Sequence, residues 1–257
     1  MEEICNDLSN EYNSLDDIVK DLDDAGWHTL TPFLEWTVRD EISHLAFFDS
    51  TARLAATDPE GFNKHIEEIM RDPKAFDKKP RGIGRNMTIE KLLEWWREER
   101  RSLLAALRPL EPKSRIPWYG PPMSAKTFAT ARIMETWAHG QDVVDALGIK
   151  REQTNRLYHV AHIGVRTFGF SFSNNGLEVP DASVRVELKS PDNELWTWGP
   201  EDSKNTVQGP VEDFCLVVTQ RRPVSKTAIV TNGDVAAQWM SIAQAFAGLP
   251  IKDIEPG

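Results

Sequence analysis

The chain has 257 residues, of which 40% are hydrophobic and 27% charged, so it is long enough to bury one large core or two smaller ones. Its 40 acidic and 30 basic residues give a net charge of −10, which argues against binding to nucleic acid or to an anionic membrane. Cys5 and Cys215 are too few for a disulfide framework, and we find neither a signal peptide nor an apolar run that could span a membrane. We therefore expect a cytoplasmic protein, a monomer or homodimer, whose partner is a small-molecule substrate.

The first 170 residues show the apolar spacing of helices. Helices are predicted at residues 4–25, 37–56, 59–71 and 88–107, and Thr37 with Asp40 gives the second of them a capping box. Residues 72–87 are predicted to form a loop and residues 108–123 a rigid, proline-rich connection, so no strand is expected before residue 170. The predicted loop carries four cations that would either attract an anionic substrate or simply be solvated: Lys78, Lys79, Arg81 and Arg85.

A nearly apolar helix is predicted over residues 124–146, and it carries Glu135 and His139 four residues apart. That spacing puts both side chains on one face, where they can converge on one metal ion. An unpaired carboxylate and imidazole are costly to bury unless something neutralises them. A metal site and a structural ion pair would both do so. The same spacing at Asp24/His28 and Asp40/His44 lacks this apolar setting.

The pattern changes after a predicted helix at residues 152–168, on which His159 and His162 could either bind metal or be a satisfied pair. Residues 171–180 break the helical period and are predicted to be a linker. Apolar residues then alternate with polar ones, which is typical of half-buried strands. The predicted fold class is α+β, with a four-helix bundle over residues 1–172 and a small α+β domain over residues 173–257.

Two stretches, WTVRDEISHLAFFD and ARIMETWAHGQDVVDALG, resemble the mycothiol-dependent maleylpyruvate isomerase family and its wider DinB-like metal-binding superfamily. In these proteins a W-x-x-x-D-x-x-x-H-L segment supplies one histidine, and an E-x-x-x-H segment supplies two further ligands. The resemblance therefore implies a DinB-like bundle with a metal site made of His44, Glu135 and His139. The stretches ELWTWGPED, FCLVVTQRR and GDVAAQWMSIAQAFAG resemble the sterol-carrier-like C-terminal domain that follows the bundle.

The resemblance also implies a reaction. A divalent metal, Zn²⁺ or alternatively Fe²⁺, would lower the pKa of a low-molecular-weight thiol such as mycothiol. The thiolate would add to the cis double bond of a small acidic substrate, allow rotation and then leave, which makes the protein a metal-dependent isomerase or thiol transferase. Apart from the resemblance, Arg221 and Arg222 would contact a substrate carboxylate if the second domain folds back over the metal, or would merely be surface arginines at the end of a helix.

Two other functions remain open at this stage. A metal hydroxide in the same open coordination position would make the protein a hydrolase. Alternatively, the protein is a non-catalytic metal- and small-molecule-binding protein whose second domain holds an apolar ligand against tryptophans: Trp196, Trp198 and Trp239.

Overall fold

The computed structural model describes residues 1–248, apart from the side chains of residues 73–77. Its contacts divide the chain into two compact units, Met1–Arg151 and Glu152–Gly257. The first unit is mainly helical, and the second combines helices with a four-stranded sheet. The predicted α+β class, with a helical part followed by a small sheet-containing part, is confirmed.

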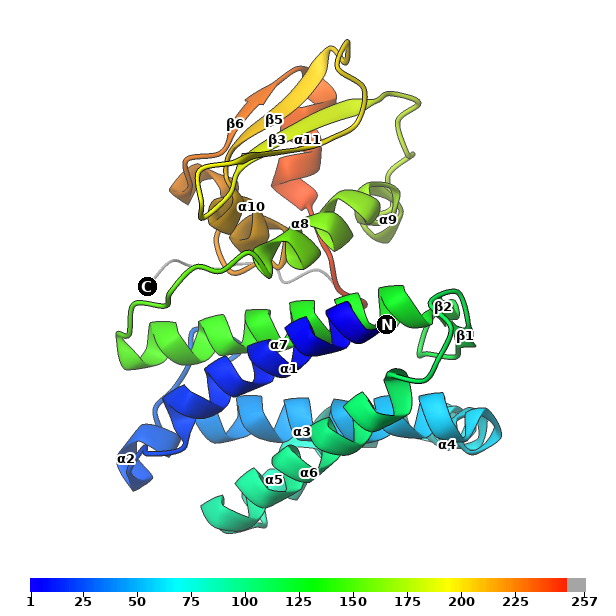
Figure 1. Ribbon diagram of the computed structural model, residues 1–257, viewed down its shortest axis with the longest axis vertical. Helices are drawn as coiled ribbons and strands as arrows, with labels where there is room; N and C mark the ends of the chain where they lie inside the picture. Colours follow the sequence, from blue (N-terminus) through cyan, green and yellow to red (C-terminus); the bar gives the residue numbers. More distant parts are fainter. Residues whose placement is uncertain (249–257) are drawn as a thin grey trace. The chain divides into compact units, whose positions relative to one another are not determined.

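Four long helices make the core of the first unit: α1 (Glu2–Val19), α3 (Val38–Thr57), α6 (Ile89–Leu107) and α7 (Ala125–Leu147). Helix α3 packs against α6 and α7, and α1 packs against the same two helices, so the four close into a bundle (Figure 1). Leucine and valine residues at helical spacing are fully buried inside it, among them Leu8, Leu45, Leu103 and Val143. No helix among the described residues is long and apolar enough to cross a membrane.

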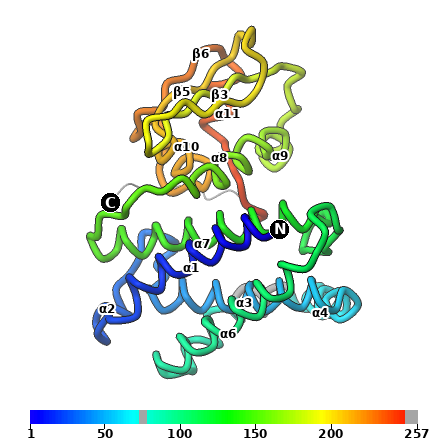
Figure 2. The backbone as a smooth tube through the Cα atoms, in the orientation of Figure 1, coloured from blue at the N-terminus to red at the C-terminus, as the bar shows by residue number. Residues whose placement is uncertain are grey.

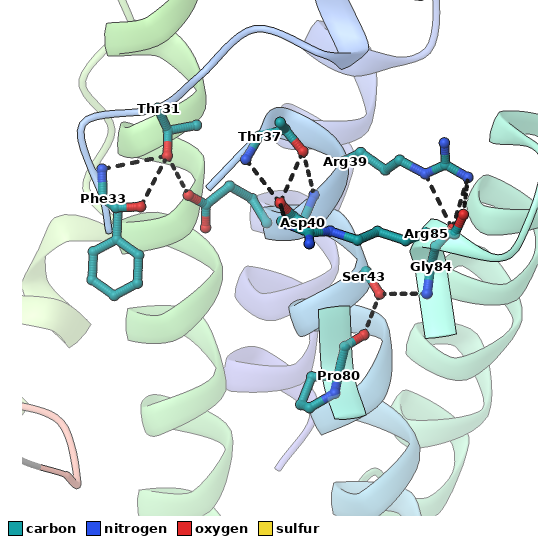
Figure 3. A network of polar contacts seen from close by, with 10 residues as sticks. Thr31, Phe33, Thr37, Arg39, Asp40, Ser43, Pro80, Gly84 and Arg85 are labelled. Atoms are coloured by element: carbon teal, nitrogen blue, oxygen red, sulfur yellow. Dashed lines mark hydrogen bonds and ion pairs between the residues drawn. The ribbon is translucent and has the colours of Figure 1, made fainter. Parts of the chain in front are cut away.

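Helix α5 (Pro73–Arg85) occupies most of the stretch that we predicted to be a loop, and that prediction was wrong. A proline inside a helix costs about 3 kcal/mol, so local sequence argues against a helix through Pro80. Contacts with α3 compensate: Ser43 Oγ donates to the Pro80 carbonyl and accepts from the Gly84 N–H (Figure 3). Arg39 also donates to the Gly84 carbonyl, at 2.9 Å, near the end of α5.

Shorter elements complete the first unit. α1 ends earlier than predicted, and the one-turn helix α2 (Asp24–Trp27) follows it, whereas α4 (Pro59–Arg71) matches its predicted range. The proline-rich connection forms a small antiparallel pair of strands, β1 (Arg115–Ile116) and β2 (Met123–Ser124). The expectation of no strand before residue 170 was therefore wrong at this place, where turn-forming residues bring two short extended segments together.

The second unit is built on a sheet of strand order β4-β3-β5-β6. Strand β3 pairs antiparallel with β4 and parallel with β5, and β5 pairs antiparallel with β6. These strands are β3 (Val184–Lys189), β4 (Leu195–Trp198), β5 (Asn205–Pro210) and β6 (Val230–Asn232). The backbone trace in Figure 2 shows α8, α10 and α11 with this sheet in one unit. The helical elements of this unit are α8 (Leu157–Arg166), α9 (Phe168–Asn174), α10 (Val211–Val218), the 3₁₀ turn η1 (Val224–Lys226) and α11 (Asp234–Ile242).

Along the chain, the boundary between the two units lies between Arg151 and Glu152, whereas the sequence placed it between residues 172 and 173. Helix α8 packs against α10 of the second unit, so it does not extend the bundle. Gly164 lies so close to α10 that a Cβ built on it would be 2.7 Å from the side chain of Val218. Part of the predicted linker at residues 171–180 is likewise the end of α9. Helical spacing shows that α8 is a helix, but it does not show which neighbours the helix packs against.

Candidate metal centre

Helices α3 and α7 pack together and bring His44 beside Glu135 and His139. The register of α3 is fixed at its start, because the Thr37 side chain caps the Asp40 N–H and the Asp40 carboxylate accepts from the Thr37 N–H. His44 lies one turn further along α3. Two segments far apart in the sequence thus deliver the three side chains that the family resemblance singled out.

The separations of these side chains fit ligands of one ion. Nε2 of His139 lies 3.4 Å from Oε2 of Glu135, and Nε2 of His44 lies 3.9 Å from the same oxygen. One ligand atom from each of the three residues lies within 4.8 Å of the other two. Two ligands on a tetrahedral ion with bonds of about 2.1 Å are about 3.4 Å apart. The spacing exceeds that of ordinary hydrogen bonds and is close to that of a shared divalent metal.

The protonation states of His44 and Glu135 are those that metal ligands require. Burial lowers the pKa of His44 to about 3, so this imidazole is neutral at physiological pH. Burial opposes ionisation of Glu135, but its interactions with His139 and His44 and the charge of Arg132 hold its pKa well below the usual value. A neutral imidazole and an ionised carboxylate are the forms of these side chains that bind a divalent cation.

A second layer of polar groups orients His139. Its Nδ1 lies 2.7 Å from Oε2 of the buried Glu41, and Thr31 donates to the other oxygen of that carboxylate at 2.7 Å. Asp142 is more distant, with Oδ2 3.8 Å from the same Nδ1. Burial, the largest effect, raises the pKa of Glu41 to about 7. A cation on the far side of the imidazole favours the ionised carboxylate, which accepts the Nδ1 proton and leaves Nε2 free to bind that cation.

Aromatic rings surround the two histidines. Trp36 stacks on His139 with an interplanar angle of 6° and a centroid distance of 5.9 Å. Phe33 meets His139 edge-on at 5.5 Å, and Phe48 lies 4.5 Å from the ring of His44. The side chain of His44 is nevertheless 18% exposed. Aromatic rings thus cover much of the site, while the side chains of His44 and Glu135 keep some contact with solvent.

A buried ion pair lies on the same two helices. Asp49 and Arg132 are 0% and 4% exposed, and the guanidinium Nε donates to Asp49 Oδ1 at 3.0 Å. Tyr12 of α1 donates to the same oxygen at 2.7 Å. This network ties α1, α3 and α7 together next to the candidate metal centre, so we assign it a structural role.

Other predicted residues lie elsewhere. Arg221 and Arg222 follow α10 in the second unit, where Arg221 is buried and donates to the Thr219 carbonyl at 2.7 Å. Their role as substrate contacts stays a prediction. Among the described residues, two sets of three side chains could hold a metal: His44 with Glu135 and His139, and Glu41 with His139 and Asp142. Neither set contains the histidines of α8, and Nδ1 of His162 accepts from the Trp198 Nε1–H at 3.2 Å.

The tryptophans expected to hold an apolar ligand have different surroundings. Trp239 is 1% exposed and packs on Phe168 and Phe214 in the core of the second unit. Trp196 and Trp198 lie beside Tyr158, at centroid distances of 5.2 Å and 5.3 Å. Trp239 therefore fills the core and does not line a site shared with the other two.

Sequence reasoning did not assign a role to Glu41, Thr31 or Trp36. Glu41 precedes His44 by three residues, so helical spacing puts it next to the histidine on the surface of α3. That signal was available, but it did not say that the carboxylate would point at a residue of another helix. Thr31 and Trp36 come from the irregular segment before α3, and their positions depend on its turn geometry.

A helical bundle that brings two histidines and a carboxylate to one point has the arrangement in which bundles build metal sites between their helices. The profile of the mycothiol maleylpyruvate isomerase N-terminal domain matches residues 8–144, and the chain belongs to this family. A second profile, described as wyosine base formation, matches residues 180–232 in the second unit.

The chain is also similar along most of its length to other proteins and to solved structures. Uncharacterized proteins from two strains of Mycobacterium tuberculosis, CDC 1551 / Oshkosh and ATCC 25618 / H37Rv, are each 41% identical to this chain over 244 residues, covering 95% of both chains. The crystal structure of the mycothiol-dependent maleylpyruvate isomerase is similar with a TM-score of 0.56 and 15% identity, over 90% of this chain and 92% of that one. The structure of a histidine mutant of that enzyme is also similar, with a TM-score of 0.56 and 15% identity over 89% of this chain and 92% of that one. The likeness of these structures shows the fold, and the family assignment suggests an enzyme.

Proposed function

We propose that this protein is a metal-dependent enzyme that uses a low-molecular-weight thiol, mycothiol, for isomerisation or thiol transfer on a small acidic substrate. One observation carries the proposal: His44, Glu135 and His139 converge on one point in a chain of this family. Two histidines and one carboxylate leave coordination positions open, as catalytic zinc requires. Zn²⁺ held there would lower the pKa of a thiol and so supply a nucleophile at neutral pH.

The residues of the chain have separate tasks in this proposal. His44, Glu135 and His139 would hold the ion, and Glu41 would keep the proton of His139 on Nδ1. Trp36 and Phe33 cover His139 and exclude water from that side. A dry site strengthens each electrostatic interaction within it and protects a thiolate from solvent. The side chain of Glu135, which is 24% exposed, marks the side from which the thiol and substrate would enter.

Cobalt substitution tests the proposal, because Co²⁺ can replace Zn²⁺ and reports its ligands by absorption. Protein loaded with Co²⁺ should gain a sulfur-to-cobalt charge-transfer band when mycothiol is added, and glutathione serves as the comparison thiol. His28→Ala, which alters an exposed histidine of the same unit, should give the same band. Glu135→Ala should give none. A cobalt protein whose spectrum does not respond to any thiol would contradict the proposed use of a thiol.

A further inference from the structure

Helix α5 presents cations to solvent and to α3, and they are not equivalent. Arg85 is bound to Asp40 through two hydrogen bonds of 2.7 Å, so it secures the helix. Lys78 and Lys79 are exposed. Arg81 is half-buried, and its guanidinium carbon lies 5.0 Å from the centre of the Trp36 ring. Arg81 is therefore the cation of this group that is directed at the surroundings of the candidate metal centre.

Trp36 connects Arg81 to the histidines. The ring of Trp36 is 8% exposed and lies 5.1 Å from the ring of His44 and 5.9 Å from that of His139. The contacts of Trp36 with Arg81 and His44 place the guanidinium within about one Debye length, about 10 Å at 0.1 M salt, of the His44 ring. An anion bound at the metal centre would lie in the field of this cation.

Hydrogen bonds hold the backbone on both sides of the cation–π contact. The Trp36 carbonyl accepts from the Thr31 N–H at 2.6 Å, across a tight turn in which Leu34 has the left-handed φ of 50°. On the other side, Ser43 of α3 bonds to the backbone of α5 at Pro80 and Gly84, as Figure 3 shows. A cation whose backbone is already fixed has less freedom to lose when it binds a ligand.

Within the described part of the chain, the charge of Arg81 is not neutralised by a carboxylate. Among the side chains that the structure describes, no carboxylate forms an ion pair with it, whereas Arg53, Arg97 and Arg100 all have such partners. The guanidinium presents a planar fork of donors that matches a carboxylate. In this acidic chain, Arg81 lies over an aromatic ring beside two metal-ligand candidates, where its fork of donors can meet an anion.

We propose that Arg81 binds a carboxylate of the molecule that is processed at the metal centre. The inference rests on the proposed function and names its ligand class: a small molecule with a carboxylate a few carbon atoms from the end that reaches the metal. The carboxylate belongs either to the substrate or to the thiol. Arg81 holds it and selects acidic ligands over neutral ones of the same shape.

Calorimetric titration of the zinc-loaded protein with maleate, and with its neutral diamide as control, tests the inference without any thiol. Loss of a charged hydrogen-bonding partner should weaken maleate binding about tenfold to a hundredfold in Arg81→Gln. Binding of the diamide and the zinc content should not change. Lys78→Gln removes the same charge from an exposed position on the same helix and should bind maleate like the wild type.

The thiol is tested separately on the cobalt protein with 3-mercaptopropionate and 2-mercaptoethanol, which differ in having a carboxylate. A loss in Arg81→Gln for maleate assigns the contact to the substrate, and a loss for 3-mercaptopropionate alone assigns it to the thiol. Unchanged binding of both carboxylates, or no binding of either by the wild type at tens of millimolar, overturns the inference. Because the maleate arm uses no thiol, an effect of Arg81 there survives even if the thiol chemistry proposed above is wrong.

Discussion

Nδ1 of His139 lies 2.7 Å from a carboxylate oxygen of Glu41, a residue of a different helix. Both side chains are buried, and Glu41 is itself held by Thr31. The contact fixes the rotation of the imidazole, so that Nε2 of His139 points toward Glu135. Nε2 lies 3.4 Å from Oε2 of that carboxylate. A carboxylate behind a ligating histidine raises the basicity of the ligand and sets its tautomer.

Replacing Glu41 by glutamine should therefore weaken zinc binding about tenfold to a hundredfold, because the amide neither holds the charge nor fixes the tautomer. Competition with a chromophoric chelator measures the affinity. Asp142→Asn is the matched control, since its carboxylate lies 3.8 Å from the same nitrogen, and it should have a smaller effect. Equal effects of the two substitutions would show that Glu41 has no special part in orienting His139.

The buried pair of Asp49 and Arg132 gives a prediction about stability. Asp49→Ala leaves a guanidinium buried without its counter-charge, so it should lower the free energy of unfolding by about 3–5 kcal/mol. Replacing both residues, as Asp49→Leu with Arg132→Met, removes the two charges together and should cost less than the single change. Urea unfolding followed by circular dichroism measures both variants. A double variant less stable than Asp49→Ala would contradict the unpaired charge as the cause of the loss.

The local sequence was enough to predict most of the long helices, because helix caps and apolar spacing act between residues close together in the chain. The capping box at Thr37 and the apolar face of α7 are local signals, and the structure contains both. The sequence pointed to Glu135 and His139 because two polar residues one turn apart are costly in an apolar helix. His44 entered only through the family resemblance, since nothing local indicates which partner a histidine on α3 will meet.

What could not be predicted depends on contacts between distant segments. Helix α5 forms in spite of Pro80 because α3 supplies hydrogen bonds to it. The unit boundary lies at Arg151 because α8 packs on α10, a helix much later in the chain. Arg81 reaches Trp36 only once α5 has formed. Predicting any of these three features requires knowing which distant segments pack together, and residue spacing and helix propensity do not give that information.

Acid should weaken the bundle through Asp16. Burial opposes ionisation of this carboxyl, but hydrogen bonds and charges from Arg97 and Arg100 outweigh that effect and lower its pKa from 3.8. The pKa of Asp16 is lower in the folded protein than in the unfolded chain. Its stabilisation of the fold is therefore complete above about pH 3.8, and it is lost as the pH falls through the lower pKa of the folded protein. Urea midpoints measured between pH 5 and pH 2 should fall less in Asp16→Asn than in the wild type. Asp21→Asn, at an exposed position beyond α1, should follow the wild type.

Packing of α8 in the second unit can be tested at Gly164. A Cβ there would lie 2.7 Å from Val218 and 3.1 Å from Phe214, so Gly164→Ala should destabilise the protein by about 1–3 kcal/mol. The zinc affinity of the bundle should not change. Gly82→Ala is the matched control, because nothing lies within 4 Å of its built Cβ in α5. A Gly164→Ala protein with normal unfolding would contradict the assignment of α8 to the second unit.

The metal content of single-ligand variants tests the central claim most directly. His44→Ala, Glu135→Ala and His139→Ala should each lose the ion, because two remaining protein ligands do not hold it tightly. Their circular dichroism should stay helical, since apolar burial and not the ion holds the bundle together. His28→Ala and His65→Ala should keep a full complement when zinc is measured by elemental analysis after dialysis. Retention of zinc by His44→Ala, with loss from His159→Ala or His162→Ala, would contradict the assigned site.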